Sequence, residues 1–150
     1  MGACRVARIM RQHDRMDEGA ISEKKVVLIA EDERAIAEIV RVVVEDAGYR
    51  PVLAAHGRQA LDLARVEHPA LVITDLMMPH LTGAGLIAAL CADATADGGV
   101  RAPVILMTAV NPSQARAAGA DAVLYKPFDL DALEALLRQF LDDSALTPDP

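Results

Sequence analysis

The sequence predicts a doubly wound α/β fold, with a five-stranded parallel sheet and helices on both faces. Between residues 26 and 141, short apolar runs alternate five times with amphipathic stretches of helical spacing. The short runs are continuously apolar, which is typical of parallel strands that are covered on both faces. A chain of 150 residues, of which 53% are hydrophobic, is long enough for one such domain.

The expected strands are compact apolar runs whose ends are marked by polar residues. The first run is followed at once by acids, and the third leads directly into Asp75. The fourth ends just before Thr108, and the fifth ends at Lys126-Pro127. We therefore expect strands over residues 26–30, 51–55, 71–74, 103–107 and 122–125.

The first two expected helices are identified by their inward-facing apolar residues and by their stop signals. Gly48 is placed to end the first helix in a left-handed conformation, and Pro69 closes the second. The second helix spans residues 57–67, with Leu61 and Ala64 facing inward. The inward positions of the first are Ile36, Ile39, Val40, Val43, Val44 and Ala47.

Three more helices are expected in the second half of the chain. One covers residues 86–91 and is followed by a surface loop over residues 93–101. A short one begins with Asn111 as N-cap and Pro112 at the first position, and Gly119 ends it within about two turns. Asp129 is expected to cap the last helix, whose inward residues are Leu130, Leu133, Leu137 and Leu141.

Charge divides the chain into two parts of different character. Residues 1–25 contain six bases and four acids, whereas residues 26–150 contain nine bases and eighteen acids. Val6, Ile9 and Met10 have a spacing that allows a short amphipathic turn in the first part. We expect residues 1–25 to form a flexible extension, residues 26–141 to form the domain, and residues 142–150 to form a frayed tail.

The composition argues against several classes of partner and location. A net charge of −7 and an aromatic content of 3% do not suit nucleic acid, which needs a basic face and stacking platforms. No apolar run is long enough to cross a membrane, and arginines interrupt any signal-peptide core. The two cysteines, Cys4 and Cys91, cannot form a disulfide framework, so a cytoplasmic location is expected.

Polar residues gather where the expected strands end, which is where doubly wound folds bind ligands. Glu31 and Asp32 follow the first strand, Asp75 the third, Thr108 the fourth and Lys126 the fifth. Each residue alone has a simpler interpretation as a helix cap or turn former. Together they predict one polar site at this edge of the sheet.

Three carboxylates in one site repel one another, so either a cation offsets them or their pKa values rise. Oxygen ligands with open positions favour Mg²⁺, and the scattered histidines do not favour zinc. Lys126 is the only lysine among the nine bases of residues 26–150, and a compact ammonium does not replace a guanidinium. A hard cation, a lysine and a hydroxyl suit a phosphoryl group, which a carboxylate can accept as an aspartyl phosphate.

In four stretches of sequence, the chain resembles the receiver domains of response regulators in two-component signalling. The matching stretches are VVLIAEDE (26–33), LVITDLMMP (71–79), PVILMTA (103–109) and GADAVLYKPFD (119–129). The resemblance implies a flavodoxin-like sheet of strand order 2-1-3-4-5. It also implies a phosphoacceptor protein rather than an enzyme, with a sensor histidine kinase or histidine phosphotransfer protein as donor. We expect a monomer or weak dimer.

The resemblance assigns roles to the acids of the site. Asp75 would take the phosphoryl group from a phosphohistidine. Asp32 and Asp75 would ligate Mg²⁺ directly, together with the backbone carbonyl of Met77. Glu31 stands where the family usually has Asp, and it would act on the metal through a water molecule.

The resemblance also gives roles to the fourth and fifth strand ends. Thr108 and Lys126 would each contact a phosphoryl oxygen, and the Lys126–Pro127 bond would be cis. Val123 stands where the family usually has the aromatic switch residue, while Tyr125 lies two positions along the same face. Thr108 and Lys126 are 18 residues apart, about four fewer than expected, so the fourth helix should lose about one turn.

Three functions are compatible with these residues. The first is a stand-alone phosphoacceptor that switches partner binding, with no output domain attached. The second is a pseudo-receiver, an interaction module without a phosphorylation-dependent switch, which Val123 and the shortened fourth helix favour. The third is an aspartyl-phosphate phosphatase or mutase, which Met77 disfavours because that position should hold a second acid. Met77 and Val110 cannot orient a water molecule, so slow self-dephosphorylation is expected.

Overall fold

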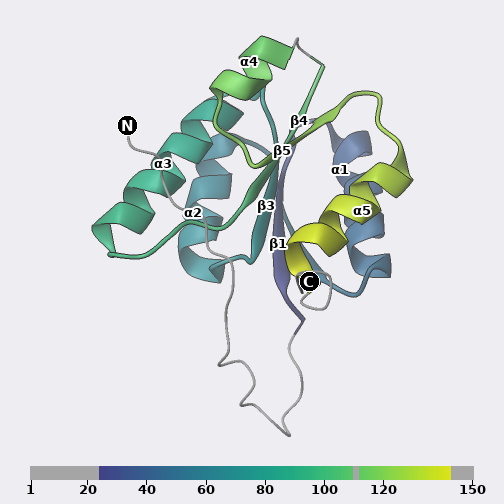
Figure 1. The fold of residues 1–150 in the computed structure, drawn as a ribbon, viewed down its shortest axis with the longest axis horizontal. Helices are drawn as coiled ribbons and strands as arrows, with labels where there is room; N and C mark the ends of the chain where they lie inside the picture. The colour runs from purple at the N-terminus through teal and green to yellow at the C-terminus, as the bar shows by residue number, and fades with distance from the viewer. Residues whose placement is uncertain (1–23, 110–111, 143–150) are drawn as a thin grey trace, which may run out of the picture.

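The computed structural model describes residues 24–109 and 112–142, which form an α/β sandwich around one sheet (Figure 1). Our predictions for residues 1–23 and 143–150, for the Asn111 cap and for Val110 lie outside these ranges. The strands are β1 (Val26–Ala30), β2 (Arg50–Ala54), β3 (Leu71–Asp75), β4 (Val104–Thr108) and β5 (Ala122–Tyr125). The helices are α1 (Arg34–Asp46), α2 (Gly57–Glu67), α3 (Gly83–Ala96), α4 (Pro112–Ala117) and α5 (Leu130–Leu141).

The sheet has the predicted order β2-β1-β3-β4-β5, with every neighbouring pair parallel. Every residue of β3 and β4 is buried, and so are four of the five residues of β1. This confirms that the continuous apolar runs are strands covered on both faces. Strand order reverses next to β1, so the carboxyl ends of β1 and β3 flank the crevice where such folds bind ligands.

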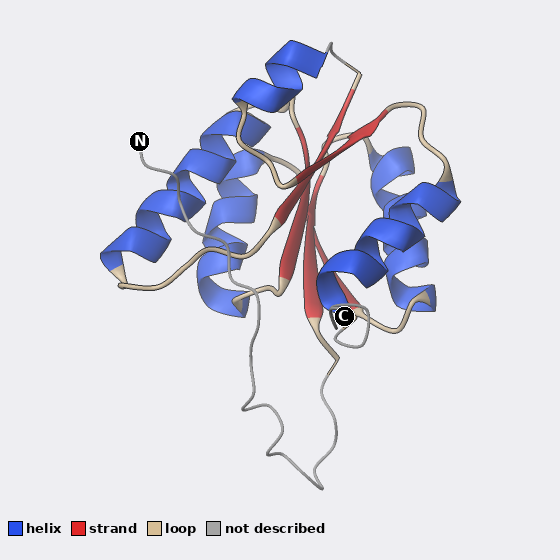
Figure 2. Cartoon of the chain, viewed as in Figure 1, coloured by secondary structure: helices blue, strands red, loops and turns tan. Residues whose placement is uncertain are grey.

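The helices form one layer on each side of the sheet (Figure 2). Helices α2 and α3 cover one face, where Leu28, Val72 and Leu106 pack with Leu61 and Leu86. Helices α1 and α5 cover the other face, where alternate strand residues pack against their buried stripes: Val27, Ile29, Ile73, Val40, Val44, Leu133 and Leu137. Successive strand residues thus point into opposite cores, as the pleat requires.

Local signals explain where helix α2 begins and where helix α1 ends. The His56 ring accepts the Gln59 backbone N–H through Nδ1 at 3.2 Å, and Gln59 Oε1 accepts the Ala55 N–H at 2.7 Å. This reciprocal cap satisfies two backbone donors at the start of α2. Gly48, with φ +98°, follows α1 in the left-handed conformation that the sequence predicted.

The prediction for the third helix was wrong, because α3 is longer at both ends. The Thr82 hydroxyl accepts the Gly85 N–H at 3.1 Å and starts the helix at Gly83. Glycine is needed there because a Cβ atom would collide with the backbone of Asp75 and Leu76. At the other end, Asp93 belongs to the helix and not to the expected loop.

Smaller corrections concern side-chain directions and strand limits. Leu130, at the start of α5, and Ile39, on α1, are 46% and 45% exposed, so neither faces the core as expected. Ile39 lies to one side of the α1 stripe formed by Ala37, Val40 and Val44. Asp129 precedes α5 but makes no side-chain cap hydrogen bond. Strands β2 and β4 are each shifted by one residue from the expected limits, and β3 extends to Asp75.

Candidate functional site

Three carboxylates meet at the carboxyl edge of the sheet, as predicted. Glu31 and Asp32 follow β1, and Asp75 is the last residue of the adjacent β3. The pairing of Ala30 with Thr74 places Glu31 beside Asp75 across the two strands. Ligand oxygens of all three acids lie within 4.8 Å of one another. Glu31 and Asp75 are buried, whereas Asp32 is exposed.

Lys126 reaches the same group of acids from the end of β5. Its Nζ lies 3.2 Å from Glu31 Oε1 and 3.5 Å from Asp75 Oδ2. The following Lys126–Pro127 peptide bond is cis, as the resemblance implied. One ammonium therefore faces three carboxylates, and the cluster keeps an excess of negative charge that a cation would offset.

Glu31 is held by two donors at once. Its Oε1 accepts from Lys126, and its Oε2 accepts the Glu33 backbone N–H at 3.1 Å. Glu31 therefore contacts the lysine directly. Its expected action on a metal through water stays a prediction.

Burial dominates the electrostatics of the two buried acids. It raises the pKa of Asp75, and the nearby charge of Lys126 and the Met77 backbone N–H only partly oppose the rise. Burial also raises the pKa of Glu31, against the opposing Glu33 N–H, and the charge of Asp75 adds to the rise. Burial alone would lower the pKa of Lys126, but the charges of Asp75 and Glu31 outweigh it and raise that pKa.

Thr108 ends β4 at the same edge. Asp75 pairs with Met107 across β3 and β4, so Thr108 lies one residue beyond the position opposite Asp75. Thr108 is fully buried, and its carbonyl accepts the Lys126 backbone N–H at 2.9 Å. The backbone thereby links the threonine to the lysine, and all five predicted residues come from strand ends at the same edge of the sheet.

The expected switch region lies on β5. Val123 is partly buried against the core beneath α2 and α3, whereas Tyr125 is 43% exposed. Helix α4 has six residues, as short as the spacing predicted, and it buries only Ala115. The aromatic ring of this face is therefore at the surface and not in the core.

Sequence reasoning missed the backbone donors of the site. The Met77 N–H donates to Asp75, while the Met77 side chain is 61% exposed, and the Glu33 N–H donates to Glu31. Every residue except proline has such a donor, so no residue type could have marked these two. The predicted contribution of the Met77 carbonyl to a metal site stays untested.

The comparison with protein families identifies the family to which this fold belongs. The family model described as the response regulator receiver domain matches residues 27–138. The chain belongs to the response regulator receiver domain family. Within residues 24–109 and 112–142, the receiver domain has no helix long and apolar enough to span a bilayer.

Two relatives that are similar to this chain, one a curated protein and one a solved structure, support this assignment. The response regulator Rre1 of Synechocystis is 36% identical over 126 residues, which cover 81% of this chain and 53% of that protein. The chemotaxis protein CheY4 of Vibrio cholerae is 30% identical with a TM-score of 0.69, covering 79% of this chain and 99% of that one. The chain spans about half the length of the curated relatives it matches.

A third solved structure is the receiver domain of the sensor histidine kinase PA1611 from Pseudomonas aeruginosa. It is 25% identical to this receiver domain, with a TM-score of 0.70, and the alignment covers 78% of this chain and 97% of that one. That structure has a magnesium ion coordinated in its active-site cleft.

Proposed function

We propose that Asp75 is the phosphoacceptor of this receiver domain and that it takes its phosphoryl group from a phosphohistidine. The observation that supports this most directly is the contact of Asp75 with Lys126 inside a cluster of two further acids. In the transfer, the P–N bond to histidine breaks and a P–O bond to a carboxylate oxygen of Asp75 forms. The donor would be a sensor histidine kinase or a histidine phosphotransfer protein.

The donor set of the site fits Mg²⁺. All available side-chain ligands are carboxylate oxygens, and their charge exceeds that of the one ammonium beside them. Asp32 and Asp75 would hold the ion together with the Met77 carbonyl, and Glu31 would act through water. The ion would supply charge neutralisation between the carboxylate and the incoming phosphoryl group.

The chain's own residues would position the transferred group. Lys126 would turn from Glu31 and Asp75 toward one phosphoryl oxygen, and the Thr108 hydroxyl would donate to another. Such a transfer depends on positioning and charge neutralisation more than on acid–base groups. A titrating base is therefore not required for this step.

Mass spectrometry after incubation with a small acyl phosphate and Mg²⁺ tests the proposal. We expect an adduct of ~80 Da that is absent from Asp75→Asn and present in the control Asp62→Asn, whose carboxylate is exposed on α2. An adduct that survives Asp75→Asn, or no adduct on the parent protein, would overturn the proposal.

A second candidate function is a pseudo-receiver, favoured by the exposed ring of Tyr125 and by the small side chain at Val123. Nuclear magnetic resonance separates the two. A phosphoacceptor that switches should show amide shifts in α4 and β5 when Asp75 is phosphorylated. Shifts confined to the neighbours of Asp75 would instead support the pseudo-receiver.

A further inference from the structure

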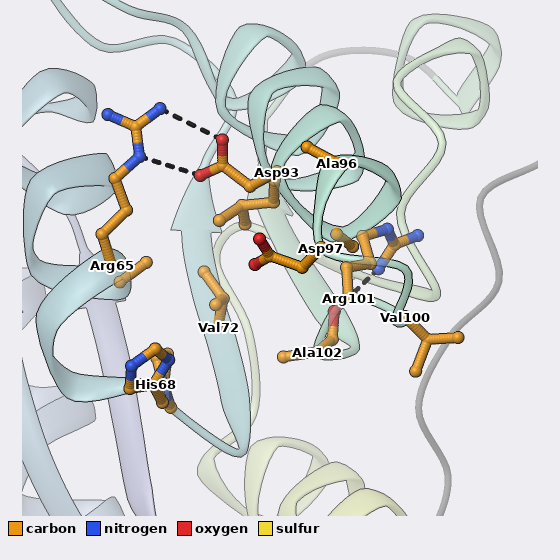
Figure 3. Close-up of a pocket in the computed structure, with 13 residues that line it drawn as sticks. Arg65, His68, Val72, Asp93, Ala96, Asp97, Val100, Arg101 and Ala102 are labelled. Atoms are coloured by element: carbon orange, nitrogen blue, oxygen red, sulfur yellow. Dashed lines mark hydrogen bonds and ion pairs between the residues drawn. The ribbon is translucent and has the colours of Figure 1, made fainter.

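A cavity of about 470 Å³ opens at the edge of the sheet opposite the phosphoacceptor site (Figure 3). Its walls are the C-terminal ends of α2 and α3, the start of β3 and the segment that leads into β4. Pro69 and Ala102, which precede β3 and β4, mark this as the amino edge of the sheet. Nothing in the proposed phosphoryl chemistry uses this cavity.

The wall of the cavity is partly apolar and partly open to solvent. The inner wall of the cavity is apolar and includes Val72, Leu90 and Ala94. Val100 lies at the mouth and is 42% exposed. The volume is sufficient for a few medium-sized side chains or a small ligand. An occupant with aliphatic side chains would cover Val100 and fill the space between the two helices.

Two arginines and two aspartates line the cavity, but both arginines are already paired, which leaves the carboxylate of Asp97 as the unpaired charge of the described lining. Arg65 is already bound to Asp93 through two contacts of 2.8 and 3.2 Å, which Figure 3 shows spanning α2 and α3. Arg101 is buried and bound to Asp121 at 2.7 Å. Asp97, the exposed C-cap residue of α3, has no side-chain partner among residues 24–109 and 112–142.

Helix dipoles add to this negative charge. The C-terminal ends of α2 and α3 both border the cavity, and the carbonyl end of a helix attracts cations. The last turn of α3 contains no basic residue that could pair with Asp97 or offset the negative carbonyl end of the helix. The complementary occupant is therefore a segment that combines aliphatic side chains with a cation for Asp97.

The chain's own N-terminal segment has this composition. Arg5, Arg8 and Arg11 alternate with Val6, Ile9 and Met10, in a part of the chain where bases exceed acids. The described chain begins at the same edge of the sheet as the cavity, because the Ala70 N–H, next to Pro69, donates to the Val26 carbonyl at 2.8 Å. Thirteen residues separate Met10 from Lys24, enough to reach ~40 Å when extended.

We propose that residues 5–11 dock into this cavity in the same molecule, with their aliphatic side chains inside and an arginine at Asp97. The covalent link supplies an effective concentration in the millimolar range, so a weak contact is sufficient. Because the cavity lies at the amino edge, docking leaves Asp75 open at the opposite edge. The inference does not depend on the phosphoacceptor role of that residue.

Paramagnetic broadening on the full-length protein tests the docking. In a Cys91→Ala variant, a nitroxide attached to Cys4 would sit next to the docked segment. We expect the amide signals of residues 93–102 to weaken at least about three-fold, and those of α1 and α5 to keep their intensity. Uniform broadening, or none in residues 93–102, would overturn the proposal.

Charge variants and isotope mixing complete the test. Replacing Arg5, Arg8 and Arg11 together with glutamate should remove the broadening, and Asp97→Asn should weaken it. The matched control Asp46→Asn, an acid at the end of α1 on the other face, should leave it unchanged. Broadening of a labelled but nitroxide-free protein by an unlabelled nitroxide-bearing one would show a second copy as occupant and would also overturn the proposal.

Discussion

Replacing Asp75 with asparagine should raise the free energy of unfolding at neutral pH without Mg²⁺. Two like charges 4.8 Å apart repel by about 3.5 kcal/mol at an effective dielectric constant of about 20, and Asp75 faces both Glu31 and Asp32 within that distance. Lys126, at 3.5 Å, offsets about 4.7 kcal/mol of this repulsion. The three neighbouring charges together thus favour a neutral side chain at this position by about 2 kcal/mol. Burial, which is the largest cause of the raised Asp75 pKa, acts in the same direction.

The stability advantage of Asp75→Asn over the parent protein should increase as the pH rises. Burial raises the pKa of Asp75 in the folded protein, so the unfolded chain releases this proton first as the pH rises. The parent protein therefore loses stability between the usual aspartate pKa and the raised folded value, whereas asparagine does not titrate. The advantage of Asp75→Asn should be small near pH 4, about the usual aspartate pKa, and complete above the folded pKa.

Urea unfolding followed by circular dichroism measures the difference. Asp62→Asn, with 61% of the Asp62 side chain exposed, is the control and should change stability by less than about 0.5 kcal/mol. Mg²⁺ should narrow the gap, because an ion bound to the native acids stabilises the parent. If Asp75→Asn is no more stable than the parent at pH 7 without Mg²⁺, the electrostatic reasoning is refuted.

Three further predictions concern other parts of the domain. Arg101→Met should destabilise the fold by about 3 kcal/mol, since it leaves the partly buried Asp121 carboxylate without its counter-ion; a urea midpoint change worth less than about 1 kcal/mol would contradict this. His56→Ala should cost about 1 kcal/mol in thermal unfolding through loss of the α2 cap, and an unchanged melting temperature would count against the cap. Met77→Asn should shorten the phosphoryl half-life on Asp75 several-fold by orienting a water molecule, and an equal half-life would disprove that explanation.

The limits of helix α2 and strand β5 were predicted to the residue, because their boundary signals are local. Helix α2 starts at the residue after a side-chain cap, and β5 ends where a lysine–proline pair follows. The location of the site was also accessible, since parallel strands bring their carboxyl ends to one edge whatever the details of packing. Glu31, Asp75 and Lys126 meet there for that reason.

What the sequence did not show depends on tertiary contact. Glycine at position 83 indicates a loop by propensity, yet it is required because the start of α3 presses on the backbone at Asp75. An acid such as Asp93 is unfavourable near the C-terminal end of a helix, but Arg65 of α2 neutralises its charge. The direct contact of Glu31 with Lys126 joins the ends of β1 and β5, which are not neighbours in the sheet, so it is visible only in the folded structure.

Helix α4 is attached to the domain by very little apolar surface. It has six residues and buries one alanine side chain, and a helix of this length has no stability of its own. Removing one alanine from its packing costs only about 1 kcal/mol, which is small beside the free energy of opening a core strand. In a hydrogen-exchange experiment, the amides of this segment should exchange first. A binding event that reshapes the surface of the domain therefore needs the least free energy at this helix.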